Sequence, residues 1–212
     1  MTLVMTYGDS NTHGTPPIVD LTKYGRFGPD IRWPTRMARD LGVDLIEEGL
    51  PGRTTRYDDP IMGAHMNGQG GLKIALESHG PIDVLVIMLG TNDVKARFTA
   101  TPAEVQGGIS SLLDIAQHRT WQDRHGGFKI LLVCPAPVVE VGPIKDEFYG
   151  ATARSSALPA LYRDLAASRG VAFMDAGQHI VVSPLDGVHF DEAAHATLAR
   201  AVGAAVKPLI GG

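Results

Sequence analysis

The segment of residues 82–89 restricts the fold of this chain most strongly, because it is a nearly continuous apolar run rich in β-branched side chains. A strand that is apolar at successive positions must be covered on both faces, which is typical of a central strand in a parallel sheet. We therefore expect a parallel sheet of five strands. The other four strands are expected at residues 3–5, 43–47, 129–134 and 171–175.

Helices are expected in the connections between these runs. The clearest boundary is the sequence Thr101-Pro102-Ala103-Glu104, which combines an N-cap threonine, a proline at the first helical position and a capping-box glutamate. Alternating strands and helices predict one α/β domain over residues 1–212, built as a three-layer α/β/α sandwich. The helices are expected at about residues 33–41, 101–117, 159–168 and 192–206, the last one closed by Pro208.

The composition excludes several classes of partner. The chain is 44% apolar and 20% charged, with a formal net charge of −4. Nucleic acids and anionic membrane surfaces are bound through a concentrated basic face, and no stretch of this sequence provides one. No run reaches the ~18 apolar residues that a membrane-spanning helix needs. We therefore expect the partner to be a small neutral molecule, with neither nucleic acid nor membrane.

With a single cysteine, the chain cannot form an intramolecular disulfide. Cys134 is the one cysteine of the chain, and it ends an apolar run typical of a buried strand. We interpret it as a core thiol. The sequence enters a strand at once, without the charged and apolar regions of a signal peptide. We expect a cytoplasmic protein.

Four short polar motifs lie just after predicted strands. Ser10 directly follows the first strand region, and Gly52 and Asn92 each come a few residues after a strand. Asp186 and His189 lie in the segment after the fifth strand. Sites in open parallel sheets form beyond the carboxyl ends of the strands. We therefore expect these residues to meet at one edge of the sheet.

Ser10, His189 and Asp186 have the residue types of a nucleophilic triad. A serine hydroxyl is a poor nucleophile at neutral pH, so it needs an imidazole to accept its proton and a carboxylate to orient that imidazole. The three-residue spacing of Asp186 and His189 would let the carboxylate reach the ring Nδ1. We predict Ser10 as the nucleophile, His189 as the general base and then acid, and Asp186 as its orienting carboxylate.

Other polar groups are interpreted as structural. Asp9 and Asp93 should hold turns by accepting backbone N–H bonds, and Trp33 and Trp121 should be packing residues. Residues 14–17 and the glycine-rich residues 68–71 lack the lysine of a phosphate loop, so no nucleotide or other cofactor is expected. The other histidines form no spaced ligand set with cysteine or carboxylate, so no metal is predicted: His13, His65, His79, His118, His125, His179 and His195.

The chain resembles the SGNH, or GDSL, hydrolases. The resemblance rests on four blocks in order: Gly8-Asp9-Ser10-Asn11, Gly49-Leu50-Pro51-Gly52, Gly90-Thr91-Asn92-Asp93 and Asp186-Gly187-Val188-His189. It implies the flavodoxin-like fold of that superfamily. Further residues resemble the bacterial arylesterases that also transfer acetyl groups to alcohols or peroxide, and those relatives are oligomeric, often octameric. These residues lie at 26–33, in Gly52-Arg53-Thr54-Thr55, and at 58–60 and 88–93.

The resemblance also implies an oxyanion hole. It would consist of the backbone N–H groups of Ser10 and Gly52 and the side-chain amide of Asn92. Neutral donors of this kind stabilise the negative oxygen of an acyl-transfer intermediate, and glycine lets the backbone approach that oxygen. His13 stands where a large aromatic is expected in the arylesterases, so the acyl pocket should differ in shape.

Three functions remain open at this point. The first is an esterase of short acyl groups, and the second is a carbohydrate O-acetylesterase that uses the same residues. The third is a non-catalytic binding module, since fold alone does not fix function. An α/β-hydrolase is excluded by the absence of a Gly-x-Ser-x-Gly elbow. Two long connections without periodicity, residues 53–71 and 135–150, are expected to wall the substrate pocket or to meet a neighbouring subunit.

Overall fold

A five-stranded, all-parallel sheet forms the centre of the protein. The computed structural model describes residues 2–210, and the strands lie in the order β2-β1-β3-β4-β5. This confirms the predicted parallel sheet. The strands are β1 (Leu3–Gly8), β2 (Asp44–Gly49), β3 (Val84–Met88), β4 (Lys129–Cys134) and β5 (Ala172–Asp175).

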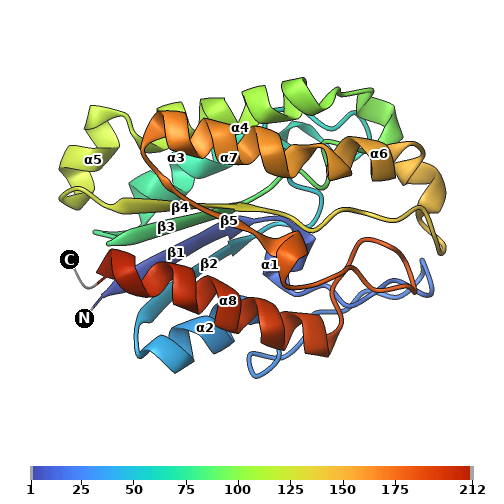
Figure 1. Cartoon of the computed structure of the whole chain (residues 1–212), viewed down its shortest axis with the longest axis horizontal. Helices are drawn as coiled ribbons and strands as arrows, with labels where there is room; N and C mark the ends of the chain where they lie inside the picture. The colour runs from blue at the N-terminus through green and yellow to red at the C-terminus, as the bar shows by residue number, and fades with distance from the viewer. Residues whose placement is uncertain (1, 211–212) are drawn as a thin grey trace.

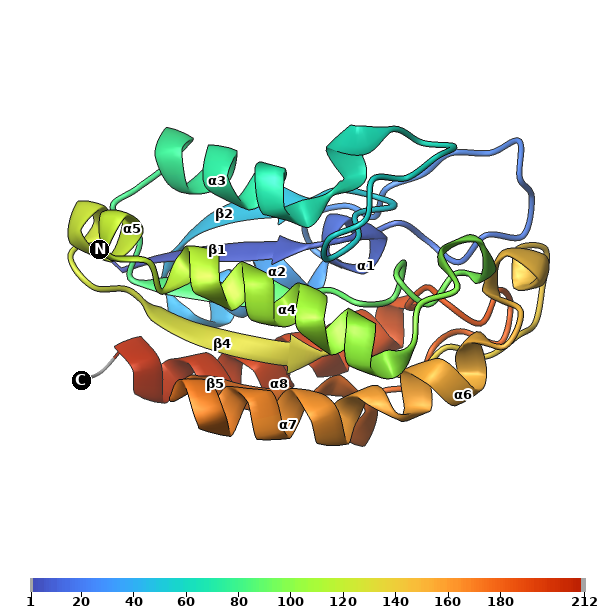
Figure 2. The ribbon, with the colours of Figure 1, turned by 90° about the horizontal axis from the view of Figure 1, so that it is seen from above.

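Helices cover both faces of the sheet (Figure 1). One face carries α3, α4 and α7, and the other carries α2 and α8; Figure 2 shows the first of these layers from above. None of the helices within residues 2–210 is long and apolar enough to span a bilayer. The helices are α1 (Ser10–His13), α2 (Trp33–Leu41), α3 (Gly68–Ser78), α4 (Pro102–Ala116), α5 (Arg119–His125), α6 (Ala151–Ser156), α7 (Leu158–Arg169) and α8 (Glu192–Ile210).

Alternating side chains of the central strands fill two separate cores. In β3, Leu85 and Ile87 join the core under α3, α4 and α7, whereas Val84 and Val86 join the core under α2 and α8. Successive side chains of a strand point to opposite faces, so a strand buried on both sides must be apolar throughout. Cys134 lies in the first of these cores as a buried free thiol, which confirms its interpretation.

The predicted boundaries of β1 were too short. Thr6 and Tyr7 continue the strand because their polar atoms find partners: the Thr6 hydroxyl donates to the Ile46 carbonyl at 3.3 Å, and the Tyr7 hydroxyl donates to the Gly68 carbonyl at 2.5 Å. A buried hydroxyl is tolerated in a strand when it is hydrogen-bonded in this way. The strand therefore carries the chain as far as Gly8.

One predicted helix end was wrong, and three helices of more than one turn were not predicted. The last helix continues through Pro208 to Ile210, because Leu209 and Ile210 still pack against the apolar core. Helix α3 was not predicted, since it begins with glycines at 68, 70 and 71. A Cβ at Gly71 would lie 2.6 Å from the Tyr7 hydroxyl oxygen, so close packing requires a residue without a side chain there. Helices α5 and α6 were also missed.

The helix boundary at Thr101 is confirmed in detail. Its side chain accepts the Glu104 N–H, and the Glu104 carboxylate in turn accepts the Thr101 N–H at 2.8 Å. Of the two tryptophans, Trp33 is fully buried, and Trp121 packs partly buried against the core. Both are packing residues, as predicted.

The register of the sheet places the ends of three strands side by side. Gly8 at the end of β1 pairs with Gly49 of β2 on one side and with Met88 of β3 on the other. Ser10, Gly52 and Asn92 follow these three positions by two to four residues. Because parallel strands point the same way, the loops that carry these residues leave the sheet at the same edge.

Candidate active site

Ser10 lies at the start of a one-turn helix, α1, directly beyond β1. The Asp9 carboxylate caps this turn by accepting the Asn11 N–H at 2.9 Å, and Gly14 ends it in a left-handed conformation. The turn therefore holds the Ser10 hydroxyl at the edge of the sheet, where the residue is 6% exposed. Asp9 has the structural role that was predicted for it.

An unbroken hydrogen-bonded chain connects Asp186, His189 and Ser10. The His189 Nε2 atom lies 3.0 Å from the Ser10 Oγ atom, although the two residues are 179 positions apart. The His189 Nδ1 atom lies 2.6 Å from Asp186 Oδ2. All three residues are buried, and Asp186 is fully so. The structure thus brings together the three residues predicted as a triad.

The Asp186 carboxylate accepts hydrogen bonds on both oxygens. Its Oδ1 atom accepts the Val188 and His189 backbone N–H groups, both at 3.0 Å, and its Oδ2 atom accepts the Ile18 N–H at 2.7 Å. Burial raises the pKa of Asp186, but the contact with His189 and the backbone N–H bonds outweigh it and hold the pKa below its usual value. An ionised carboxylate only accepts, so Nδ1 of His189 carries the proton and Nε2 can accept the Ser10 proton.

Gly52 and Asn92 line the same cavity as Ser10 and His189. Gly52 has φ +92°, a backbone conformation that strains any residue with a Cβ, so this position favours glycine. The Asn92 side-chain N–H donates to the Arg53 carbonyl at 3.1 Å, and its second amide hydrogen has no partner within residues 2–210. Neither the Ser10 nor the Gly52 backbone N–H bonds a protein acceptor in that range. Three donors thus remain unused beside the serine.

Arg53 is a residue of the site whose role the sequence did not reveal. Its guanidinium carbon lies 4.0 Å above the centre of the Tyr7 ring, and its Nη1 atom donates to the Gly8 carbonyl at 3.1 Å and to the Glu48 carbonyl. It therefore joins the ends of β1 and β2 through its side chain, and its own carbonyl orients Asn92. The sequence did contain a signal for this role, because Arg53 directly follows Gly52, which was predicted as a site residue.

Asn11 joins the two distant parts of the triad. Its side-chain N–H donates to the Val188 carbonyl at 3.1 Å, across 177 positions. The Trp33 indole N–H donates to the Asn11 carbonyl at 3.1 Å, so this residue is held from both sides. The loop that carries His189 is therefore tied directly to the turn that carries Ser10.

Asp93 holds a loop, as predicted. Its carboxylate accepts the Thr55 N–H at 3.0 Å and the Thr55 hydroxyl at 2.6 Å. Burial raises the pKa of Asp93 to about 6, against the effect of these hydrogen bonds. The contact fixes the loop after Gly52 against the loop that contains Asn92.

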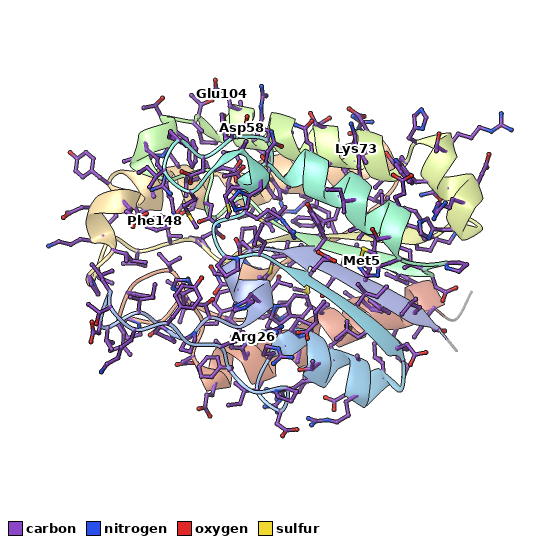
Figure 3. All side chains as sticks on the ribbon, turned by 180° about the vertical axis from the view of Figure 1, so that it is seen from behind. Met5, Arg26, Asp58, Lys73, Glu104 and Phe148 are labelled. Atoms are coloured by element: carbon purple, nitrogen blue, oxygen red, sulfur yellow. The ribbon has the colours of Figure 1, made fainter. Side chains whose placement is uncertain are left out.

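A largely apolar cavity of about 340 Å³ opens next to the serine. The two long loops that were expected to wall the pocket do contribute, with Met62 from one and Ile144 and Phe148 from the other. Phe148 lies at the end of the molecule opposite the chain termini (Figure 3). A third segment, residues 15–25, supplies much of the wall and was not predicted to do so.

His13 lies next to a wall residue of this cavity rather than on its surface. It is absent from the lining, and its Nδ1 atom faces the Thr15 hydroxyl at 3.1 Å. Thr15 lines the cavity instead. Within residues 2–210, no group of three or more histidine, cysteine or acidic side chains is arranged to hold a metal ion.

Known proteins resemble this chain in sequence and in structure. The model of the GDSL-like lipase/acylhydrolase family matches residues 6–197. Est24, a carbohydrate acetylesterase from Sinorhizobium meliloti, is 34% identical with a TM-score of 0.92, over 99% of this chain and 100% of Est24. The native M. smegmatis aryl esterase is 36% identical with a TM-score of 0.89, over 99% and 100% of the two chains. No match was found among curated protein sequences.

The chain belongs to the GDSL-like lipase/acylhydrolase family. It has the fold of the SGNH hydrolases, with a five-stranded parallel sheet between helices. It is a carboxylic ester hydrolase of that superfamily, as the sequence motifs predicted.

His195 lies beneath the site as a buried neutral base. Its Nδ1 atom accepts the Trp33 backbone N–H at 3.3 Å, and its Nε2 atom has no partner within residues 2–210. The rings of Phe27 and Phe190 pack edge-on against it. Burial lowers the pKa of His195 to about 4.

We expect His195 to make folding stability fall in mild acid. In the unfolded chain the His195 side chain takes up a proton near pH 6.5, whereas in the folded protein it is protonated only near pH 4. The contribution of His195 to the free energy of unfolding is therefore complete above pH 6.5 and decreases by about 3 kcal/mol as the pH falls to 4. In His195→Asn, whose amide oxygen can accept the Trp33 N–H, this part of the pH dependence should disappear from urea unfolding. His65→Gln, at an exposed position, should keep it, and parallel pH profiles for wild type and His195→Asn would contradict the prediction.

Proposed function

We propose that this protein is a serine esterase that cleaves short-chain, acetyl-type carboxylic esters, including aryl esters, through an acyl-Ser10 intermediate. The observation that carries the proposal is the unbroken Asp186–His189–Ser10 chain beside a cavity. Hydrogen bonds alone can be structural. The same residues, however, combine an ionised carboxylate, an imidazole that can accept a proton and a hydroxyl at a pocket wall, which is the arrangement that acyl transfer needs.

In the first half of the reaction, Ser10 Oγ attacks the ester carbonyl carbon while its proton moves to His189 Nε2. The tetrahedral intermediate collapses by breaking the bond to the alcohol oxygen, which takes the proton from His189. In the second half, His189 removes a proton from water, and the resulting hydroxide attacks the acyl-Ser10 carbonyl. The carboxylic acid leaves, and the proton returns to the Ser10 oxygen.

The unused donors beside Ser10 support an oxyanion hole. The backbone N–H groups of Ser10 and Gly52 and the free amide hydrogen of Asn92 would receive the negative oxygen of the intermediate. One such donor is worth roughly 3 kcal/mol of transition-state stabilisation when it is held in place beforehand. Here Arg53 holds Asn92 through its carbonyl, so the amide needs no reorganisation during the reaction.

The size and character of the cavity support small esters. Its volume of about 340 Å³ lies at the small end of the range for ligand pockets, and its walls are mainly apolar. An alcohol or peroxide that enters in place of water would accept the acyl group. A carbohydrate O-acetylesterase is the second candidate, and it is favoured by the structural similarity to a carbohydrate acetylesterase.

Loss of the Ser10 hydroxyl should abolish catalysis. We expect Ser10→Ala to lower kcat on 4-nitrophenyl acetate by at least ~10³, because the triad acts as a unit. A serine-reactive phosphonate should add its mass at Ser10 in the wild type and in Ser155→Ala, which removes a buried serine of α6. Intact-protein and peptide mass spectrometry check both. An active preparation without this adduct would exclude the mechanism.

Acyl length should limit turnover. For 4-nitrophenyl esters from acetate to octanoate, we expect kcat/KM to be highest for the shortest acyl groups and to fall beyond butyrate, because the cavity is small. Adding an alcohol acceptor should divert part of the acetyl group to a new ester, measured by chromatography. Phenyl acetate and acetylated xylan, compared directly, separate the two candidate functions. A preference for octanoate would contradict the proposed specificity.

We also propose that the protein is a homo-oligomer in solution. Exposed apolar side chains surround the mouth of the cavity: Val19, Leu21 and Tyr24 are 65%, 68% and 86% exposed, and Ile61 and Tyr149 are each 77% exposed. Val19 and Tyr24 line the cavity, and Ile61 and Tyr149 are next to lining residues. A clustered apolar surface of this kind favours burial against another protein surface.

Light scattering after size exclusion should therefore give a multiple of 22.6 kDa. Leu21→Asp should lower that mass, because it places a charge in the exposed apolar surface. Ile74→Asp is the matched control, since Ile74 is also 68% exposed but lies on α3, away from the cavity mouth. A wild type that runs as a monomer at micromolar concentration would exclude the proposal.

A further inference from the structure

Four charged side chains line the cavity as two ion pairs. The Asp20–Lys23 pair is exposed to solvent, with side chains 39% and 82% exposed, whereas Lys95 of the second pair is buried in the wall of the cavity. Lys95 and Glu147 both line it, and the Lys95 Nζ atom lies 3.3 Å from Glu147 Oε2. The Lys95 side chain is only 9% exposed, whereas that of Glu147 is 46% exposed. Neither residue belongs to the triad or to the donors beside Ser10.

The backbone holds Lys95 close to the catalytic edge of the sheet. The Lys95 N–H donates to the Asn92 carbonyl at 3.2 Å, so the lysine belongs to the same turn as the oxyanion-hole asparagine. Glu147 comes from a different loop of the wall, in the short 3-10 helix Lys145–Phe148. The ammonium also lies 5.5 Å from the centre of the Phe148 ring.

The loop of Asp59 and the loop of Glu147 are connected by Arg97, not by Lys95. Its Nη1 atom donates to Glu147 Oε2 at 2.9 Å, and its Nη2 atom donates to Asp59 Oδ2 at 2.8 Å. This guanidinium already joins the loop of Asp59 to the loop of Glu147. The loops therefore have an ionic connection without Lys95, and an apolar side chain at position 95 would fit the rest of the wall.

Hydrogen-bonding capacity at this pair remains unused. An ammonium has three donors, and Glu147 is the only side-chain partner of Lys95 within residues 2–210. Both cations that pair with Glu147 contact its Oε2 atom, and its Oε1 atom accepts no hydrogen bond in that range. Burial lowers the pKa of Lys95, while Glu147 opposes this effect. A buried charge with free donors is costly unless a ligand completes its bonding.

We infer that Lys95 and Glu147 form a hydroxyl-binding subsite, and that the preferred substrate is an acyl ester of an alcohol carrying at least one further hydroxyl group. This inference rests on the proposed esterase function. The hydroxyl oxygen accepts from Lys95 Nζ, and its hydrogen is donated to Glu147 Oε1. A short acyl group has no hydroxyl, so the recognised group belongs to the alcohol part of the ester.

The charges of Lys95 and Glu147 determine how strongly the subsite should prefer a hydroxylated ester. A site built to bind a hydroxyl discriminates against the analogue that lacks it, because its own polar groups then remain unpaired. With a charged donor and a charged acceptor, the discrimination should be about tenfold or more. The hydroxylated ester and its analogue make the same apolar contacts with the remaining wall, so these contacts cancel when the two kcat/KM values are divided.

Matched pairs of esters test the subsite. The monoacetates of diols with two to six carbons are compared with alkyl acetates of the same length, and the ratio of their kcat/KM values is measured. Wild-type protein should prefer the hydroxylated ester about tenfold or more at one chain length, the one that spans from Ser10 to the pair. In Lys95→Met that ratio should fall towards one. Lys145→Met removes an exposed lysine next to the pair and should keep the wild-type ratio.

The possible outcomes distinguish the proposed subsite from the proposed esterase function. A wild-type ratio near one at every length, or an unchanged ratio in Lys95→Met, would overturn the subsite and leave the esterase intact. A Lys95→Met protein that loses activity on both esters in proportion would assign Lys95 a structural role and also overturn it. Absence of turnover and of Ser10 acylation with all esters would instead exclude the proposed function itself.

Discussion

The carboxylate of Asp186 is the group on which the rest of the site depends. It is fully buried and contacts the ring of its own histidine, two backbone N–H groups of its own loop, and the Ile18 N–H of the cavity wall. These contacts keep it ionised despite burial. One charge therefore sets the proton position on His189, shapes the loop that carries it and anchors the segment that walls the pocket.

The sheet supplies the positions that these side chains need. Because Gly8, Gly49 and Met88 end their strands in register, the three following loops leave the same edge. Arg53 then fixes that edge by donating to carbonyls at the ends of β1 and β2 while its own carbonyl orients Asn92. The donors beside Ser10 are thus held by backbone geometry and by a buried guanidinium, which suits preorganised stabilisation of a developing charge.

The cavity combines two environments with different physical roles. Around Ser10 the polar groups are few, neutral or internally paired, and the walls are apolar, which strengthens electrostatic interactions with a reacting carbonyl. Farther along the wall, Lys95 and Glu147 join Arg97 and Asp59 behind them in a buried or half-buried ionic cluster with equal numbers of each sign. The proposed chemistry at Ser10 and the proposed hydroxyl recognition at Lys95 and Glu147 would therefore use separate parts of one pocket.

The sequence by itself determined the sheet, the best-capped helix and the residues of the four motifs, because strand periodicity, capping and reactive side chains are local properties. It missed α3, whose glycines weaken the helical pattern, and the helical end beyond Pro208, which packing maintains. Only the tertiary structure decided that Asn11 bonds Val188, that Ile18 bonds Asp186 and that residues 15–25 wall the cavity. These contacts join segments up to 177 positions apart, and no local pattern encodes them, since each depends on where the completed sheet places both partners.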